Sequence, residues 1–464
     1  MTARESVDAV VIGTGQGGKP LAGDLAEAGM SVAVIERDRV GGTCVVRGCT
    51  PTKTMVASAR VAHLARRAGD YGVETGDVSV DMEVVRRRKR EIVDAWVDGS
   101  RKGLERHDGL ELIFGEARFT GERELAVDLR EGGVRRLASE RIFVNTGARP
   151  LVPPVPGLED VAYLDSTSVM ELGEVPAHLV VLGGGFIGLE FGQMFRRFGA
   201  DVTIVERGDR LAAREDEDVS EALEQILEED GLRVLTGTEA VAVEPARGGD
   251  GVRLDVDGPD GREAVSASHL LVAAGRRPNT DALDLEATGL STDDRGYLPV
   301  NDRLETDVEG IWALGDVTGR PPFTHTSYDD YRIVRDNLLE GADRTDEDRI
   351  LTYTVFTDPQ LGRVGTTEAE ARASGRRVRV AKLPMSRVAR AIEMDETRGF
   401  MKAVVDADTR EILGAAVLGV EGGEVAMALK IAMMGDLPWT ALRDAVLAHP
   451  TLAESLNNLF MTLD

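Results

Sequence analysis

The strongest constraint on the fold is one pattern that the 464-residue chain carries twice, once near its N-terminus and once near its middle. Each copy is an apolar stretch, a glycine-rich turn, a helical stretch, a second apolar stretch and a final acidic residue. The acid follows the first glycine at the same distance in both copies, 23 residues from Gly13 to Glu36 (36 − 13) and 23 from Gly183 to Glu206 (206 − 183). The pattern therefore predicts two βαβ units, each with a parallel pair of strands.

Each turn of the pattern reads G-x-G-x-x-G, and each glycine in it has a physical task. The first makes a tight turn, the second lets the backbone approach a pyrophosphate, and the third lets the helix pack closely on the strand. The helix N-terminus offers free N–H groups to the phosphates, and the final acid accepts hydrogen bonds from ribose hydroxyls. One such turn is weak evidence, but two matching copies predict two dinucleotide sites, one for a flavin and one for a nicotinamide coenzyme. The glycines are Gly13, Gly15 and Gly18 in the first copy and Gly183, Gly185 and Gly188 in the second.

Composition and charge exclude several classes of protein. The formal net charge of −26 argues against a nucleic-acid partner, and the apolar share of 42% is that of a folded globular chain. No run of about 18 apolar residues occurs, so we expect no membrane span. The N-terminus lacks the basic region and apolar stretch of a signal peptide. We therefore expect a cytoplasmic protein.

The chain has only two cysteines, Cys44 and Cys49, five residues apart. A secreted disulfide scaffold would contain more. A metal site would need further ligands nearby, and none follow, so we expect no structural metal. A buried structural pair remains an alternative, but a close pair in a cytosolic chain favours redox chemistry, in which the two thiols could also hold a metal substrate transiently.

The positions of the two motifs predict the domain organisation. The fold class is α/β, with two Rossmann-like, three-layer ββα dinucleotide-binding domains and a C-terminal α+β domain. We expect residues 1–151 to form the first part of the first domain, 152–278 the second domain, 279–347 the rest of the first domain, and 348–464 the C-terminal domain.

The segment Gly41–Lys53, which contains both cysteines, resembles the active-site motif of the class I pyridine nucleotide–disulfide oxidoreductases. Two segments narrow the resemblance to the subgroup of mercuric reductase-like proteins and the bacterial reactive-chlorine-resistance copper(II) reductase: Phe323–Tyr331 and Glu454–Phe460. Four others fit the family as a whole: Asn145–Ala148, Val272–Asn279, Leu314–Val317 and His449–Glu454.

The resemblance implies roles for the residues of the redox centre. Cys49 would lie under the flavin as a charge-transfer thiolate, and Cys44 would face the substrate as the interchange thiol. Lys53 and Glu190 match the family's ion pair near the flavin N5. Arg47 lies between the cysteines, where it would lower their pKa or attract an anionic substrate; simple solvent exposure is the alternative.

The resemblance also implies the cofactors, FAD and NADH or NADPH. Glu36 would bind the adenosine ribose of FAD, Asp316 the ribityl chain, and the helical stretch after Thr326 would aim its N-terminus at the flavin. The further cofactor-binding residues are Gly42, Thr43, Lys53, Thr146, Gly147, Glu206, Arg207 and Gly275.

The carboxylate of Glu206 favours NADH, since it suits a free ribose 2′-hydroxyl and repels a 2′-phosphate. Arg207 and Arg210 lie close enough in sequence to keep NADPH open. Phe186 follows the second glycine turn, where it is either a gate over the nicotinamide site or a core residue.

His449 and Glu454 match the family's acid–base pair, in which a carboxylate orients an imidazole. In the family this histidine serves the active site of the other subunit. The resemblance therefore implies a homodimer with residues 348–464 as its interface.

We expect an enzyme that passes electrons from NAD(P)H through FAD and the Cys44–Cys49 disulfide to an acceptor. The acceptor would be a metal ion such as Cu(II) or Hg(II), a small disulfide, or an oxidant. Mercury reduction is less expected, because mercuric reductase carries a second, C-terminal cysteine pair. A dihydrolipoamide dehydrogenase is the second enzymatic reading, and a redox-sensing or electron-carrier flavoprotein is the alternative from another class.

Overall fold

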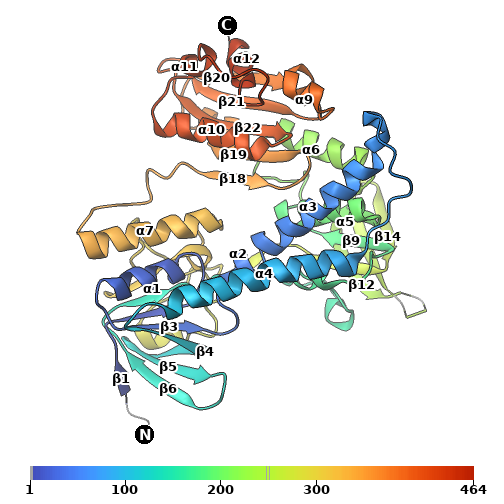
Figure 1. Ribbon diagram of the computed structural model, residues 1–464. Helices are drawn as coiled ribbons and strands as arrows, with labels where there is room; N and C mark the ends of the chain where they lie inside the picture. Colours follow the sequence, from blue (N-terminus) through green and yellow to red (C-terminus); the bar gives the residue numbers. More distant parts are fainter. Residues whose placement is uncertain (1–3, 247, 250, 464) are drawn as a thin grey trace. The chain divides into compact units, whose positions relative to one another are not determined.

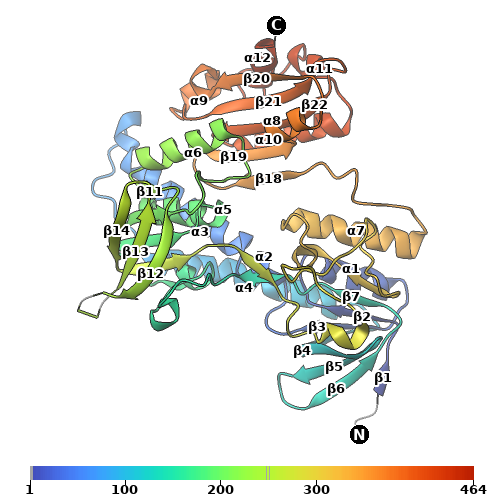
Figure 2. The same cartoon turned by 180° about the vertical axis from the view of Figure 1, so that it is seen from behind.

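The structure is a computed structural model that describes residues 4–246, 248–249 and 251–463. Its contacts divide the chain into two compact units, each built from three stretches of sequence. Unit 1 combines Met1–Thr54, Glu83–Leu151 and Gly275–Arg349, and unit 2 combines Met55–Met82, Val152–Ala274 and Ile350–Asp464 (Figures 1 and 2).

An eight-stranded sheet with the order β1-β6-β5-β4-β3-β2-β7-β17 forms the centre of unit 1. Its middle strands are parallel, whereas β4, β5 and β6 form an antiparallel extension. The strands are β1 (Arg4–Ser6), β2 (Ala9–Ile12), β3 (Val32–Glu36), β4 (Leu110–Gly121), β5 (Glu124–Leu129), β6 (Val134–Ala138), β7 (Ile142–Val144) and β17 (Ile311–Ala313). A separate antiparallel pair is formed by β8 (Ala148–Pro150) and β16 (Arg276–Pro278).

Both faces of the unit 1 sheet are buried, which explains the unbroken apolar run of β2. Ala9 and Val11 face a core with α1 and α7, while Val10 and Ile12 face a second core on the opposite side. Helices α1 and α7 lie on the same side of the sheet (Figure 1). The helical elements are α1 (Gly18–Glu27), α2 (Gly42–Val46), the start of α3 (Cys49–Arg66), α4 (Met82–Glu105), η4 (Leu285–Thr288), η5 (Gly315–Thr318) and α7 (Thr324–Glu340).

Helix α7 begins at Thr324, so our expectation of a helix after Thr326 placed its start three residues too late. Pro321 and Pro322 cannot continue a helix from upstream, and Phe323 has an extended backbone and directly precedes the first helical residue.

Unit 2 contains the second βαβ unit in a four-stranded parallel sheet with the order β11-β10-β9-β15. A three-stranded antiparallel sheet follows in the same part of the chain. The elements are β9 (His178–Leu182), α5 (Phe186–Phe198), β10 (Asp201–Val205), α6 (Glu217–Glu229), β11 (Arg233–Leu235), β12 (Glu239–Pro245), β13 (Val252–Gly258), β14 (Gly261–Ala267), β15 (His269–Val272), η1 (Ala68–Tyr71), η2 (Leu158–Asp160) and η3 (Ser168–Glu171).

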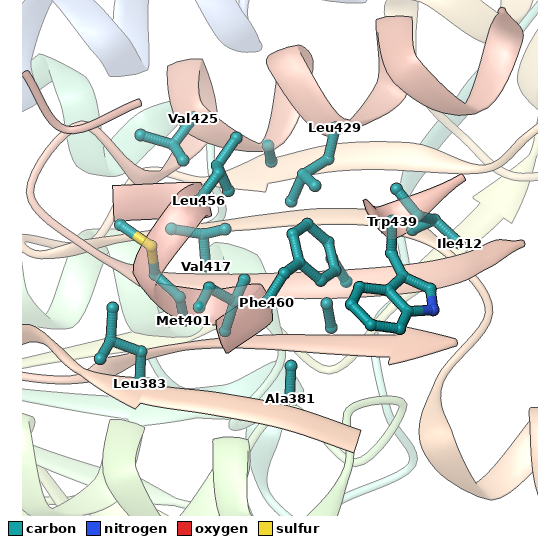
Figure 3. Packing of buried hydrophobic residues seen from close by; sticks show 14 of the residues in the cluster. Ala381, Leu383, Met401, Ile412, Val417, Val425, Leu429, Trp439, Leu456 and Phe460 are labelled. Carbon is teal, nitrogen blue, oxygen red and sulfur yellow. The ribbon is translucent and has the colours of Figure 1, made fainter. Parts of the chain in front are cut away.

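The C-terminal part of unit 2 is a five-stranded antiparallel sheet with the order β18-β19-β22-β21-β20. A hydrophobic core of this part packs Phe460 and Trp439 against strands β21 and β22 and helix α10 (Figure 3). The elements are β18 (Thr352–Val355), β19 (Gln360–Gly365), α8 (Glu368–Ala373), β20 (Val378–Pro384), η6 (Met385–Arg387), α9 (Ala389–Glu393), β21 (Phe400–Asp406), β22 (Ile412–Gly419), α10 (Gly422–Met434), α11 (Trp439–Arg443) and α12 (Ser455–Met461). Among the helices of the described residues, none is long and apolar enough to span a bilayer.

Candidate functional site

The first glycine turn closes around Asn145, which begins a segment that resembles the family but to which the sequence analysis gave no role of its own. The backbone N–H of Gly18 donates to Asn145 Oδ1 at 2.9 Å, and a Cβ on Gly15 would lie 2.7 Å from the same oxygen. Asn145 Nδ2 donates in turn to the carbonyl of Leu314 at 2.7 Å. One side chain at the end of β7 therefore fixes the turn after β2 and the chain after β17.

The second glycine turn repeats the geometry of the first. Gly13 and Gly183 both have a positive φ, +102° and +117°. A Cβ on Gly18 would collide with the carbonyl oxygen of Gly13, and a Cβ on Gly188 would collide with that of Gly183. Beside Gly185, a Cβ would meet nothing within 4 Å, which leaves the open approach that a pyrophosphate needs.

The acids that end the two βαβ units are held in the same way. Glu36 accepts hydrogen bonds from the backbone N–H groups of Thr14, at 3.2 Å, and Asp38, at 2.9 Å. Glu206 accepts them from Gly184 and Gly208, each at 2.6 Å. Both carboxylates are thus fixed beside a glycine turn, whereas the neighbouring Arg207 is exposed.

Helix α2 lies directly against the first glycine turn. Gln16 Nε2 donates to the carbonyl of Gly41 at 3.1 Å. Gly42 has φ +66°, and a Cβ there would lie only 2.6 Å from the Cα of Gly15. Gly42 and Thr43 therefore sit where a phosphate bound to the turn would be in reach of α2.

The two cysteines lie on consecutive helices, Cys44 inside α2 and Cys49 as the first residue of α3. Gly48 allows the close turn between them, since a Cβ there would lie 2.8 Å from the carbonyl oxygen of Thr43. Cys49 Sγ lies 3.3 Å from Oγ1 of Thr324, the first residue of α7. The N-termini of two long helices therefore meet at Cys49.

The electrostatics distinguish the two thiols. A hydrogen bond with Cys49, together with burial, raises the pKa of Cys44, and Thr324 and Lys53 offset only part of this rise. These surroundings disfavour ionisation of Cys44, while Cys49 lies at a helix N-terminus, where the dipole favours negative charge.

The two cations of the cysteine segment have different surroundings. Lys53 lies one helical turn after Cys49 on α3, and its charge acts on Cys44. Arg47 forms an ion pair with Asp38, and it is not among the groups that most influence the pKa of Cys44. The structure thus gives Arg47 an intramolecular partner.

Asp316 lies in η5, on a turn that a second aspartate fixes. Asp330 is fully buried, accepts the backbone N–H of Gly315 at 2.8 Å and pairs with Arg349 at 2.7 Å. Burial raises the pKa of Asp316, although Arg276, 3.8 Å away, opposes the rise. The only signal in the sequence that could have pointed to Asp330 is its place in the segment that carried the family resemblance.

The unit 1 residues fit an FAD. The hydroxyl of Thr146 is buried and has no hydrogen-bond partner among the described residues, as expected for a group that awaits a polar ligand. Gly147 and Gly275 have φ +68° and +137°, and a Cβ on Gly147 would meet nothing within 4 Å. An unsatisfied donor, an open glycine and the fixed Glu36 lie on the strands and turns that would surround a dinucleotide.

In unit 2, Glu190 is buried on α5 and accepts the backbone N–H of Phe356 at 2.8 Å. Lys53 belongs to unit 1, so the predicted ion pair between Lys53 and Glu190 stays a prediction. Phe186, the first residue of α5, is partly buried, and its ring centre lies 5.1 Å from that of Tyr353.

His449 and Glu454 form a hydrogen-bonded pair in the C-terminal part of unit 2. His449 Nδ1 lies 2.8 Å from Glu454 Oε2 and 3.1 Å from Oε1. Glu454 is the N-cap residue of α12, and the imidazole is 67% exposed in the single chain. Only Nδ1 is engaged by the carboxylate, so the pair can present Nε2 to a proton donor.

Comparison with known families gives two matches. Residues 7–330 match the family described as pyridine nucleotide-disulphide oxidoreductase, and residues 351–460 match the dimerisation domain of that family.

Three known proteins illustrate the likeness. The chain is similar to the probable pyridine nucleotide-disulfide oxidoreductase RclA of Escherichia coli (strain K12), with 40% identity over 456 residues, 97% of this chain and 98% of RclA. It is similar to the mercuric reductase of Streptomyces lividans, with 36% identity over 98% of this chain and 96% of that protein. Its structure is similar to the Cu(II) complex of the HOCl-induced flavoprotein disulfide reductase RclA from Escherichia coli, with a TM-score of 0.90, 38% identity, and coverage of 99% and 100%. The likeness confirms the predicted fold class.

Proposed function

Because the chain belongs to the pyridine nucleotide-disulphide oxidoreductase family, as the resemblance of its cysteine motif predicted, we propose that it is an NADH-dependent reductase that delivers electrons to Cu(II). The chain is an FAD-dependent disulfide reductase of the group that contains RclA and the mercuric reductases, and its redox pair is Cys44 and Cys49. The coenzyme preference and the acceptor are the proposal.

The observation that carries the proposal is the asymmetry of the two thiols. Cys49 lies at the junction of two helix N-termini beside Thr324, whereas its hydrogen bond with Cys44 and the burial of Cys44 disfavour ionisation of Cys44. A thiolate in the Cys49 position can donate charge to a neighbouring electron-poor ring, and a protonated Cys44 can be activated when a substrate arrives. The two thiols therefore suit the two separate tasks of a dithiol relay.

FAD would be held by the first glycine turn, Glu36, Gly42, Thr43, Thr146 and Asp316, and when bound it supplies the transfer of two electrons from the coenzyme to the disulfide. The protein residues set the charge around that transfer. The N-terminus of α7 stabilises negative charge, and Lys53 contributes a cation. Glu190 would pair with this lysine.

The reaction balances with one coenzyme and two metal ions. NADH converts the Cys44–Cys49 disulfide into the Cys44 thiol and the Cys49 thiolate and becomes NAD⁺, so the S–S bond breaks and one sulfur gains a proton. Two Cu(II) ions then take one electron each and become Cu(I). The Cys44 thiol loses its proton in this step, and the S–S bond forms again. The His449–Glu454 pair would accept and return the proton of Cys44 through Nε2.

We propose that the second subunit supplies His449 to the site of the Cys44–Cys49 pair. The match to a dimerisation domain implies that the chain forms a homodimer. The 67% exposure of His449 in the single chain supports a role in which its ring meets another subunit.

Glu206 supports NADH as the coenzyme. Both oxygens of its carboxylate accept backbone N–H groups, which hold a negative charge beside the second glycine turn. A fixed carboxylate accepts hydrogen bonds from a ribose 2′-hydroxyl and repels a 2′-phosphate.

Cu(II) is proposed because a relative that covers nearly the whole chain was solved as its Cu(II) complex. Thiolate sulfur also binds and reduces copper readily. Hg(II) and small disulfides would react with the same two sulfurs, and the experiment below compares them.

The test is an anaerobic titration of the FAD-loaded enzyme with NADH, followed by addition of each acceptor. A long-wavelength absorption band at two electrons per subunit would place the Cys49 thiolate against oxidised flavin. Cu(II) should remove that band faster than Hg(II) or glutathione disulfide does, and Cys44→Ser should abolish the reaction. If Cys44→Ser reduced Cu(II) as fast as the wild type does, the dithiol route would be refuted and an electron-carrier flavoprotein would be favoured.

A further inference from the structure

One face of helix α5 is docked along the segment that runs from β18 to β19. Four residues spaced by four, three and four positions make this face: Phe186, Glu190, Gln193 and Arg197. The segment that receives them is residues 353–358.

The contacts along this face follow the order of both chains. The ring of Phe186 lies 5.1 Å from that of Tyr353, and Glu190 accepts the N–H of Phe356 at 2.8 Å. The side-chain amide of Gln193 makes two hydrogen bonds with the backbone of Asp358. Its Oε1 accepts the N–H of Asp358 at 2.8 Å, and its Nε2 donates to the carbonyl of Asp358 at 2.9 Å. The Glu190 contact therefore lies between two other contacts of the same two segments, the Phe186–Tyr353 ring contact and the Gln193–Asp358 hydrogen bonds.

Asp358 also fastens α5 to α3, the helix that begins with Cys49. Its carboxylate pairs with Arg60 of α3 at 2.5 Å and with Arg197 of α5. Burial alone would raise the pKa of Asp358, but Arg197 and Arg60 outweigh burial and leave that pKa lowered. Arg66 of α3 donates to the carbonyl of Arg197, which adds a second tie between the same two helices.

A buried ion pair is weak evidence for stability, because desolvation of both charges offsets their attraction. What such a pair does secure is a single geometry, since any shift leaves a charge uncompensated. Here the geometry being secured is that of two helices whose N-terminal turns carry functional groups, Cys49 and Lys53 on α3 and Phe186 and Glu190 on α5.

We propose that Asp358 and Gln193 are positioning residues for the reaction of the coenzyme with the flavin. They hold Glu190 and Phe186 in place on α5, and they fix the axis of α3, whose first turns carry Cys49 and Lys53. The inference rests on the proposed function in one respect, namely that Lys53, Glu190 and Phe186 act in the coenzyme half-reaction.

The experiment measures flavin reduction by NADH in the holoenzyme, with anaerobic stopped-flow absorbance. The variants are Asp358→Asn, which removes one charge, and Gln193→Leu, which removes the amide contacts but keeps both ion pairs. The matched controls are Asp257→Asn, an aspartate paired with Arg262 at 2.9 Å, and Gln225→Leu, a glutamine bonded to Glu229 at 2.8 Å. Bound FAD and the melting temperature are recorded for each protein.

Both test variants should slow flavin reduction by about tenfold, since small misplacement of reacting groups costs that much or more. Their isotope effect with NADH deuterated at C4 should rise, their FAD content should stay equal to that of the wild type, and both controls should be unchanged. Rates within twofold of wild type, with only a lower melting temperature, would overturn the proposal, as would a loss that lost FAD accounts for. If Asp358→Asn does not fold, the rate of Gln193→Leu alone decides between these outcomes.

The reduction of the flavin by NADH comes before the reduction of the Cys44–Cys49 disulfide. A negative result would therefore leave the proposed Cys44–Cys49 relay and the Cu(II) acceptor untouched, and those are tested separately by Cys44→Ser.

Discussion

Cys49 Sγ and Thr324 Oγ1 lie 3.3 Å apart, although 275 residues separate them in the sequence. The contact joins the N-terminus of α3 to the N-terminus of α7, so two helix dipoles and one hydroxyl favour negative charge at the same sulfur. Thr324 was not among the residues that our sequence analysis placed in the site.

The hydroxyl of Thr324 should strengthen the charge-transfer thiolate. Thr324→Val keeps the shape of the side chain but removes its hydrogen bond, which stabilises the Cys49 thiolate by about 1 kcal/mol. We therefore expect the long-wavelength band of the two-electron-reduced enzyme to lose half or more of its intensity at pH 7. Thr324→Ser should restore the band. An undiminished band in the valine variant, measured by anaerobic absorbance, would show that the contact is incidental.

The His449–Glu454 pair should serve the oxidative half-reaction and leave the reductive one alone. We expect His449→Gln to lower turnover with the acceptor by about 10²- to 10⁴-fold, the usual contribution of a general acid–base, while flavin reduction by NADH keeps its rate. Glu454→Gln removes only the charge that orients the imidazole, so it should lower turnover less than His449→Gln does.

The placement of His449 in the other subunit can be tested by mixing inactive subunits. Cys44→Ser and His449→Gln chains, coexpressed in equal amounts, should regain about a quarter of the wild-type activity, since half of the dimers are mixed and each holds one intact site. No recovery in dimers shown to be mixed by mass spectrometry would place both groups in one chain.

Glu206 should set the coenzyme preference. Glu206→Gln keeps the side-chain shape and removes the charge that repels a 2′-phosphate, so the ratio of kcat/KM for NADH to that for NADPH should fall by about tenfold, or roughly 1.4 kcal/mol. Glu239→Gln, an exposed acid on β12, is the control. An unchanged ratio would move the source of the preference away from Glu206.

Gly42 should be required for FAD binding because a Cβ at this position would crowd Gly15, an effect that can be tested separately from backbone strain. Alanine at either Gly42, φ +66°, or Gly72, φ +74°, would be strained by about 1 kcal/mol, but only at Gly42 would the new Cβ press on Gly15. We expect Gly42→Ala to weaken FAD binding at least tenfold by fluorescence titration and Gly72→Ala to leave it unchanged. Equal effects would refute the crowding argument.

His63 should make the fold sensitive to acid. Burial, aided by Arg197, lowers its pKa from 6.5 to about 4, and its Nε2 is buried without a hydrogen-bond partner among the described residues. The unfolded chain therefore binds this proton more readily than the folded one, and the contribution of His63 to the free energy of unfolding is complete above pH 6.5 and lost as the pH falls towards 4.

Denaturant unfolding at pH 7 and pH 5 checks this prediction. His63→Gln should reduce the loss of stability between the two pH values. His178→Gln should not, because both ring nitrogens of His178 have partners at 2.9 Å. A loss as large in His63→Gln as in the wild type would assign the acid sensitivity to other groups.

Much of the site could be predicted because its signals are local. The spacing of Gly13 to Glu36 and of Gly183 to Glu206 reflects the fixed length of a strand, turn and helix, so a linear pattern carries it. Cys44 and Cys49 are likewise brought together by one short turn at Gly48, and His449 and Glu454 are five residues apart. The sequence by itself therefore determined the two βαβ units, the thiol pair and the closeness of His449 to Glu454.

The tertiary structure decided which distant residues complete these local motifs. Asn145 reaches the first glycine turn across 127 residues, Thr324 reaches Cys49 across 275, and Asp358 meets Gln193 across 165. No periodicity or spacing in the chain encodes such pairs, because they depend on how sheets and helices pack once the local elements have formed. Sequence pattern fixes what lies within a turn or a helix, whereas the partner of a buried polar group is set by the requirement that it be satisfied in the packed interior.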